Sequence, residues 1–132
     1  MGKLSTHVLD TASGKPAAGI TIRLFNSSAT SSLLIKTVTT NADGRVDGAL
    51  LQEQDFKPGR YRLEFDVAAY FKAQSDKLAS PTDQASESAT ASSSAIPFLD
   101  LVPIEFGIAN SEQNYHIPLL ISPWSYSTYR GS

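Results

Sequence analysis

Cysteine is absent from the 132 residues of the chain. Its absence excludes disulfide bonds and thiolate chemistry, and it fits a reducing compartment. Charge is sparse and balanced, because 11 lysine and arginine residues face 13 aspartate and glutamate residues. This balance gives no electrostatic reason to expect nucleic acid or a membrane as a partner. A chain of this length is expected to fold as one domain around one core.

Long apolar runs are missing as well. No segment approaches the roughly 20 apolar residues that span a bilayer, and the start MGKLSTHVLD lacks the apolar core of a secretory signal. The last three residues, Arg-Gly-Ser, differ from the peroxisomal signal Ser-Lys-Leu. We therefore expect a cytoplasmic protein, with peroxisomal import by another route as the alternative.

Motifs of several large enzyme classes do not occur. Two histidines without cysteine cannot alone supply the three or four ligands that are typical of a protein zinc site, and there is no HExxH or CxxC. The serine-hydrolase pattern GxSxG, the phosphate loop GxxxxGK and the dinucleotide pattern GxGxxG are also missing. We expect no metal and no cofactor.

The chain does contain short stretches in which apolar and polar residues alternate. A period of two residues predicts strands, here at residues 4–10, 20–25, 33–40, 60–67, 98–108 and in a final pair from residue 115. Turn signals such as Asp43-Gly44 and Pro58-Gly59 separate them. About seven to eight short strands with little helical periodicity predict an all-β sandwich.

Proline and small residues mark the exceptions to this pattern. Because proline lacks the donor of a β-ladder, Pro103 and Pro118 are predicted at a sheet edge or a bulge. Residues 68–74 are predicted to form one short helical turn. The segment at about 73–95 is rich in serine and alanine, so it buries too little apolar surface to offset its ordering entropy. It is predicted to be a flexible insertion in the single domain 1–132.

Few side chains are suited to chemistry. His7 and His116 each lie within a predicted strand, and a near-neutral pKa would let either transfer a proton at physiological pH, although a structural role is the common one for an isolated histidine. Arg45 follows a turn. Glu64 and Asp66 alternate with apolar residues, which is typical of the wet face of a strand rather than of an acid/base pair.

Three blocks of sequence resemble the motifs of one family. The stretches LSTHVLDTASGKPAAG, TNADGR and YHIPLLISP with STYRGS are similar to those of the 5-hydroxyisourate hydrolases, the purine-catabolic enzymes of the transthyretin-related family. Together with YRLEFDVAAYF they span most of the chain outside the serine- and alanine-rich segment. That segment is longer than the link expected there, and Trp124-Ser125 stands where Tyr-Gly is usual. The resemblance implies a transthyretin-like β-sandwich.

The resemblance also implies an active site and a reaction. Its catalytic residues map to His7, Arg45 and His116, and its substrate-binding residues map to Asp43, Tyr129, Arg130, Gly131 and Ser132. The implied reaction opens the six-membered ring of 5-hydroxyisourate by hydrolysis, giving 2-oxo-4-hydroxy-4-carboxy-5-ureidoimidazoline. The two histidines would form an acid/base pair and Arg45 would stabilise developing negative charge. Which histidine is the base stays open.

The resemblance further implies a homotetramer whose site lies in a channel between subunits. Trp124, Tyr126 and Tyr129 crowd the terminal strand, and aromatic residues are enriched where chains meet. Two other functions stay open at this point. A transthyretin-like carrier of small ligands would share the sandwich, and a structural β-domain would explain the strands but not the three matching blocks.

Overall fold

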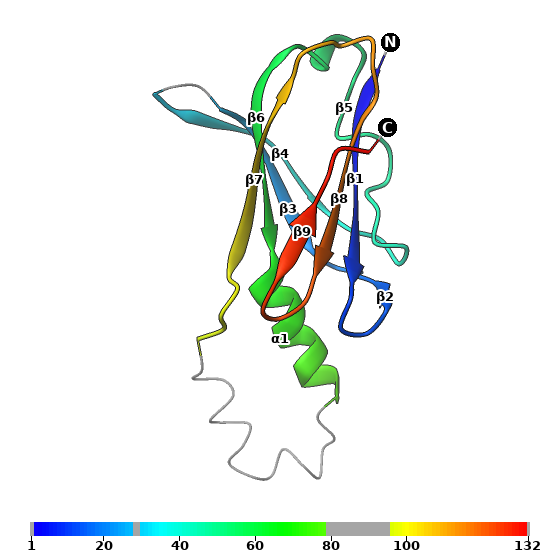
Figure 1. Ribbon diagram of the computed structural model, residues 1–132, viewed down its shortest axis with the longest axis vertical. Coiled ribbons are helices and arrows are strands. Elements are labelled where there is room, and N and C mark those ends of the chain that lie inside the picture. Colours follow the sequence, from blue (N-terminus) through cyan, green and yellow to red (C-terminus); the bar gives the residue numbers. More distant parts are fainter. Residues whose placement is uncertain (1, 28–29, 79–95, 132) are drawn as a thin grey trace.

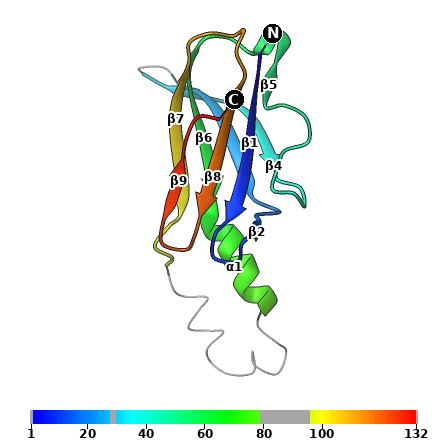
Figure 2. The same cartoon turned by 45° about the vertical axis from the view of Figure 1, so that its right-hand side comes forward.

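Two β-sheets stack face to face in the computed structural model, which describes residues 2–27, 30–78 and 96–131 (Figures 1 and 2). The first sheet has the strand order β2-β1-β8-β9, and β5 also pairs with β1. Its strands are β1 (Lys3–Asp10), β2 (Lys15–Pro16), β5 (Leu51–Gln52), β8 (Tyr115–Ile121) and β9 (Tyr126–Thr128).

The second sheet has the strand order β4-β3-β6-β7. Its strands are β3 (Thr21–Ser27), β4 (Ser32–Thr39), β6 (Gly59–Asp66) and β7 (Leu101–Ile108). A 3-10 turn, η1 (Glu53–Asp55), and one helix, α1 (Val67–Leu78), complete the described elements. The predicted all-β sandwich with one helix is confirmed. No helix among the described residues is long and apolar enough to cross a membrane.

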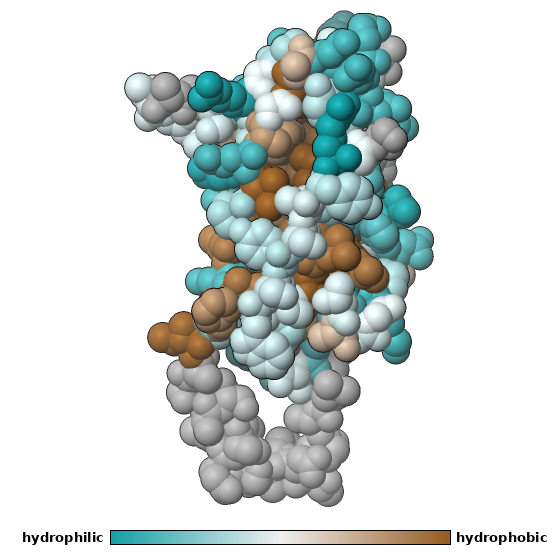
Figure 3. Space-filling model, in the orientation of Figure 1, coloured by the Kyte–Doolittle hydropathy of each residue, from teal (hydrophilic) through white to brown (hydrophobic). Residues whose placement is uncertain are grey.

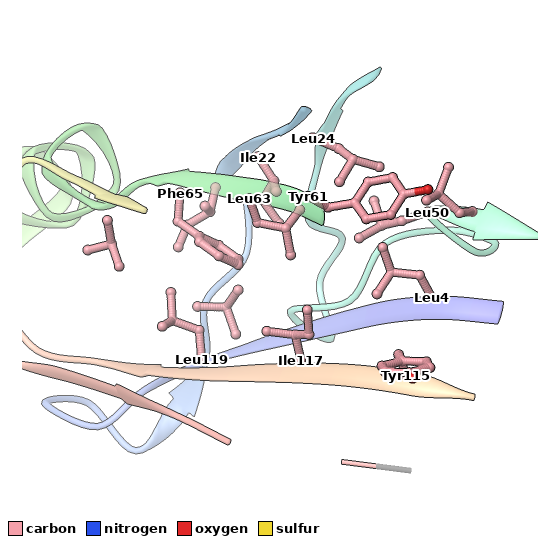
Figure 4. Packing of buried hydrophobic residues seen from close by; sticks show 14 of the residues in the cluster. Leu4, Ile22, Leu24, Leu50, Tyr61, Leu63, Phe65, Tyr115, Ile117 and Leu119 are labelled. Atoms are coloured by element: carbon pink, nitrogen blue, oxygen red, sulfur yellow. The ribbon is translucent and has the colours of Figure 1, made fainter. Parts of the chain in front are cut away.

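The core lies between the sheets and follows from the alternation in each strand. In β1 the side chains of Leu4, Thr6 and Val8 are buried, while those between them are only half-buried. Figure 4 shows the inward side chains of the two sheets meeting, among them Leu63 and Phe65 from β6. Each such fully buried side chain contributes about 1.5–3 kcal/mol relative to leaving it exposed. This burial fixes which face of β1 and β8 looks outward.

The first and last long strands of the chain lie side by side. β1 and β8 pair in parallel, from Leu4 beside Tyr115 to Asp10 beside Ile121. The buried hydroxyl of Thr6 also donates to the carbonyl of Ile117 at 2.6 Å, which ties the two strands together inside the core. This pairing brings residues that are 111 positions apart into contact.

Helix α1 is longer than the single turn predicted from the sequence. It begins at Val67, where the Asp66 carboxylate accepts from the amide of Ala69 at 3.1 Å and so caps the first turn. It continues to Leu78, aided by the ion pair of Lys72 with Asp76 at the helical i,i+4 spacing. The predicted flexible insertion at about 73–95 was therefore wrong for residues 73–78, which are helical; residues 79–95 lie outside the described residues.

The prediction that prolines within strands lie at an edge or a bulge is right for one of the two and wrong for the other. Pro103 lies in β7, which is an edge strand, as predicted. Pro118 lies in β8, which is a central strand between β1 and β9, so the prediction of an edge or bulge was wrong. The ladder with β9 is nevertheless interrupted there. Leu119 pairs with Thr128, and His116 forms an isolated bridge with Gly131 in the same register, which leaves Pro118 opposite Tyr129.

The strand predicted at 98–108 begins later than the alternation suggests. β7 starts at Leu101, and Phe98 is 75% exposed outside it. The alternation within the strand does place one set of side chains inward, because Val102 and Ile108 are buried and Ile104 and Phe106 pack against the core.

A buried hydrogen bond ties α1 to the end of β1, and its removal is the first prediction. The Tyr70 hydroxyl donates to Oδ2 of Asp10 at 2.9 Å, and Asp10 is only 3% exposed. Burial raises the pKa of Tyr70, so this phenol stays a donor. Because hydrogen bonds to charged groups are worth about 1.5–3 kcal/mol, Tyr70→Phe should lower the free energy of unfolding by that amount in urea titrations followed by circular dichroism.

Tyr61→Phe is the matched control. The Tyr61 hydroxyl donates to a neutral acceptor, the Lys57 carbonyl, at 2.7 Å, so its loss should cost only about 1 kcal/mol. Equal losses of unfolding free energy in the two variants would contradict the larger contribution expected from the hydrogen bond between Tyr70 and Asp10.

Candidate active site

Two histidines lie on the outer face of the first sheet. Strand pairing places His7 beside Pro118 and Ser5 beside His116, and the residues at positions 5, 7 and 116 all point away from the core. His7 and His116 are therefore diagonal neighbours on adjacent strands. Both are half-buried, which leaves each ring partly open to a ligand.

The loop between β4 and β5 brings Arg45 to the same place. Arg45 forms an isolated bridge with His7, and the carbonyl of Gly44 accepts from the amide of Val8 at 2.8 Å. The loop is braced internally, because Oδ1 of Asn41 accepts from the amides of Asp43 at 2.8 Å and Arg45 at 3.2 Å. The predicted turn is confirmed, and its partner is β1, which the sequence did not indicate.

Gly44 is required where this loop meets β1. Its φ of +73° is in the left-handed region, and a Cβ at this position would lie 2.4 Å from the carbonyl oxygen of Val8. Only glycine combines this backbone conformation with so close an approach. The glycine of the block TNADGR thus lets the loop dock beside His7.

The C-terminal segment covers the other side of His116. The amide of Gly131 donates to the carbonyl of His116 at 2.6 Å, and the amide of His116 donates back at 3.4 Å. A Cβ at Gly131 would lie 3.1 Å from Cδ2 of the imidazole, so main chain packs against the ring. Tyr129 is 64% exposed, and Ser132 lies outside the described residues.

Arg130 is engaged with the protein itself. Its Nη2 donates to Oε1 of Gln113 and to the carbonyl of Asn114, both at 3.2 Å, and its guanidinium lies 4.1 Å from the centre of the Tyr115 ring. These contacts attach the C-terminal segment to the start of β8. A role of Arg130 in binding substrate stays a prediction.

Partial burial and the charge of Arg45 lower the proton affinity of both histidines. Partial burial lowers the pKa of His7 below the ordinary value of 6.5 and the positive charge of Arg45 lowers it further, while the carbonyl and carboxylate of Asp43 oppose the change. Burial, then Arg45, then His7 lower the pKa of His116 from the same value. Both imidazoles are therefore neutral at physiological pH and can accept a proton.

Ser5 is a site residue that the sequence did not single out. Its Oγ lies 2.8 Å from Nδ1 of His116. The alternation does place Ser5 and His7 on one face, but only the pairing of β1 with β8 shows that Ser5 meets His116. The structure thus gathers His7, Arg45, Asp43, His116 and Gly131 from the predicted set and adds Ser5. Within ranges 2–27, 30–78 and 96–131, no three His, Cys, Asp or Glu residues cluster as metal ligands would.

Comparison with known proteins identifies the family of this site. A family model described as HIUase/Transthyretin family matches residues 4–131. The chain belongs to the HIUase/Transthyretin family. It is 49% identical over 131 residues to a 5-hydroxyisourate hydrolase of Mesorhizobium japonicum, covering 99% of this chain and 93% of that protein.

Solved structures of the HIUase/Transthyretin family share the fold. The 5-hydroxyisourate hydrolase of Klebsiella pneumoniae matches with a TM-score of 0.69 and 30% identity over the whole of both chains. A sea bream transthyretin in complex with thyroxine matches with a TM-score of 0.77 and 27% identity, covering 98% of this chain and 94% of that one. Hydrolases and a thyroxine-bound transthyretin thus share this fold, and the side chains of the site must distinguish them.

The position of Arg45 yields a prediction about proton affinity. Replacing its positive charge in Arg45→Gln should raise the pKa of both His7 and His116, because a neighbouring cation disfavours the imidazolium form. Titration of the histidine C2 protons by NMR measures both values. Arg60→Gln, on the outer end of β6, is the control and should move neither. Unchanged values in Arg45→Gln would contradict the electrostatic coupling.

Proposed function

We propose that this chain hydrolyses 5-hydroxyisourate in urate catabolism, opening its six-membered ring to give 2-oxo-4-hydroxy-4-carboxy-5-ureidoimidazoline. The observation that carries the proposal is the grouping of two neutral histidines and one arginine on one sheet face of a member of the HIUase/Transthyretin family. A relative that is 49% identical is named 5-hydroxyisourate hydrolase, and the solved hydrolase of Klebsiella pneumoniae has a similar fold.

The proposed reaction needs two proton transfers and one charge-stabilising group. One histidine removes a proton from water as its oxygen adds to a ring carbonyl, and the carbonyl oxygen gains negative charge that Arg45 stabilises. The carbon–nitrogen bond of the ring then breaks. The leaving nitrogen takes back the proton that the first histidine removed from water, directly or through the second histidine, and the former carbonyl carbon ends as a carboxylic acid that ionises to a carboxylate. No covalent intermediate, metal or cofactor is required.

The polarity of the face favours hydrolysis over carrying an aromatic hormone. Small-molecule sites are lined mostly by apolar side chains with a few polar groups that fix orientation. Here His7, His116 and Arg45 lie together, and partial burial and then the positive charge of Arg45 lower the pKa of both imidazoles. Such perturbed groups are typical of catalytic sites. The cytoplasmic location stays part of the proposal and is supported by the lack of cysteine.

A spectroscopic assay tests the activity. Added to freshly generated 5-hydroxyisourate, the protein should accelerate the loss of its ultraviolet absorbance well beyond the spontaneous rate. His7→Ala, His116→Ala and Arg45→Ala should each remain folded, because these side chains lie outside the core, and each should lower kcat/KM by at least about 10²-fold. Arg60→Gln should retain the parental rate. Decay equal to that in buffer, in a cuvette where a known hydrolase works, would overturn the proposal.

We further propose that the active unit is a homotetramer with the site in a channel between subunits. The outer face that carries the histidines is not covered by any other described element of the chain. Trp124 and Tyr129 beside it are 74% and 64% exposed. Figure 3 shows apolar groups exposed on both sides of the pale C-terminal segment. β7 and β9 are edge strands of the two sheets, and an open edge offers backbone groups to a second copy.

Dilution tests the shared site. Leu120 points outward from β8 and is half-buried, so Leu120→Arg should place a charge in the subunit contact and reduce both assembly and activity while the fold remains. Sedimentation and rate should fall together over a dilution series. Leu34→Arg, at a half-exposed site on β4, is the control and should assemble normally. Folded monomers with full activity per chain would refute the shared site.

A further inference from the structure

The hydroxyl of Ser5 has a fixed partner in the site. In the parallel register Ser5 lies directly beside His116, and the flanking pairs join Leu4 to Tyr115 and Thr6 to Ile117. Leu4, Thr6 and Ile117 are buried, so core packing holds both neighbours of Ser5 in place. The distance of 2.8 Å from Oγ to Nδ1 of His116 is that of a hydrogen bond. The backbone, rather than a mobile loop, sets this contact.

The imidazole of His116 is confined on a second side. Gly131 lies against it, and even a Cβ there would come within 3.1 Å of Cδ2 and 3.2 Å of Cβ of the histidine. Ser5 occupies Nδ1, so Nε2 is the remaining nitrogen of the ring. The orientation of the ring is thus defined by a hydroxyl on one strand and by main chain on the C-terminal segment.

We propose that Ser5 is a positioning residue for hydrolysis, whose hydroxyl accepts a hydrogen bond from Nδ1–H of His116 and so makes Nε2 the nitrogen that exchanges protons with the substrate. This inference rests on the proposed function. With the proton held on Nδ1, the neutral ring presents the lone pair of Nε2 as a base. After Nε2 takes a proton from water, both nitrogens carry hydrogen and the bond to Ser5 persists. Return of that proton to the leaving nitrogen restores the starting form.

The surroundings of the ring support this assignment. Burial lowers the pKa of His116, and the nearby Arg45 and then His7 lower it further, so the ring is neutral at physiological pH. For a neutral imidazole, the position of its single proton decides whether Nε2 is a base or a donor. Isolated neutral histidine in water favours the proton on Nε2, so the protein has to impose the other tautomer. In catalytic sites, a hydrogen-bond partner on one ring nitrogen commonly fixes the tautomer and leaves the other nitrogen to exchange protons.

Two variants and one control test the role. Ser5→Ala removes the hydroxyl, whereas Ser5→Thr keeps it and suits a strand. Loss of one hydrogen bond, worth about 1.4 kcal/mol or less, predicts a fall in kcat of up to about 10-fold in Ser5→Ala with little change in KM. Ser5→Thr should retain most of the parental kcat. Ser127→Ala, the same chemical change on β9 of the same sheet, should leave the rate unchanged.

The decisive readout is the nitrogen NMR spectrum of His116, which needs no substrate. At a pH where the ring is neutral, the parent and Ser5→Thr should show the proton on Nδ1, and Ser5→Ala should shift toward the proton on Nε2. A parent ring protonated on Nε2, an unchanged tautomer in Ser5→Ala, a parental kcat in folded Ser5→Ala, or an equal loss in folded Ser5→Thr would each overturn the inference. If Ser5→Ala does not fold, the tautomer of His116 in the parent still tests the inference: a proton on Nδ1 supports it and a proton on Nε2 overturns it. A protein with the predicted tautomer but no hydrolysis would refute the proposed function instead.

Discussion

The site depends on the parallel pairing of β1 with β8. Seven consecutive residue pairs, from Leu4 with Tyr115 to Asp10 with Ile121, join the two ends of the chain. Since side chains alternate between faces, the burial of one set of residues in these strands turns His7 and His116 outward. A shift of either strand by one residue would send its histidine into the core and expose its apolar residues. The hydrophobic core therefore specifies the geometry of the polar face.

The electrostatics of that face oppose folding at acid pH. The pKa of each histidine is lowered in the folded chain by burial and by Arg45, and that of His116 also by His7. A group with a lowered folded pKa binds its proton more readily in the unfolded chain. The associated stability is fully present above the ordinary histidine pKa of 6.5 and is lost as the pH falls from there through the lowered pKa of the folded chain. The arrangement that keeps the imidazoles neutral therefore makes the folded state less tolerant of acid.

The sequence predicts what is local and misses what depends on distant partners. Alternation alone places Leu63 and Phe65 of β6 in the core and His7 on the other face of β1 from Val8. It cannot show that Ser5 meets His116 or that the loop at Gly44 docks on β1, because both contacts are made by segments far apart in the chain. The family resemblance supplied the residues His7, Arg45 and His116 but not their arrangement. Composition also misjudged residues 73–78, where a cap at Asp66 and a local ion pair extend the helix.

Pro118 and Gly131 together determine how the C-terminal segment lies beside β8. Pro118 has no amide hydrogen to give to the residue opposite it, so the ladder of β8 with β9 stops at Leu119 and resumes at His116 with Gly131. The interruption leaves Tyr129 exposed opposite Pro118, at the end of the row of residues formed by Arg45, His7 and Pro118. Beyond it, the contacts of Arg130 with Gln113, Asn114 and Tyr115 secure the segment, so that the backbone of Gly131 can lie against His116. A side chain at position 131 would press on the imidazole. The C-terminal segment therefore forms one side of the site. Arg130 holds the segment in place, and glycine at position 131 lets its backbone lie close to the imidazole of His116.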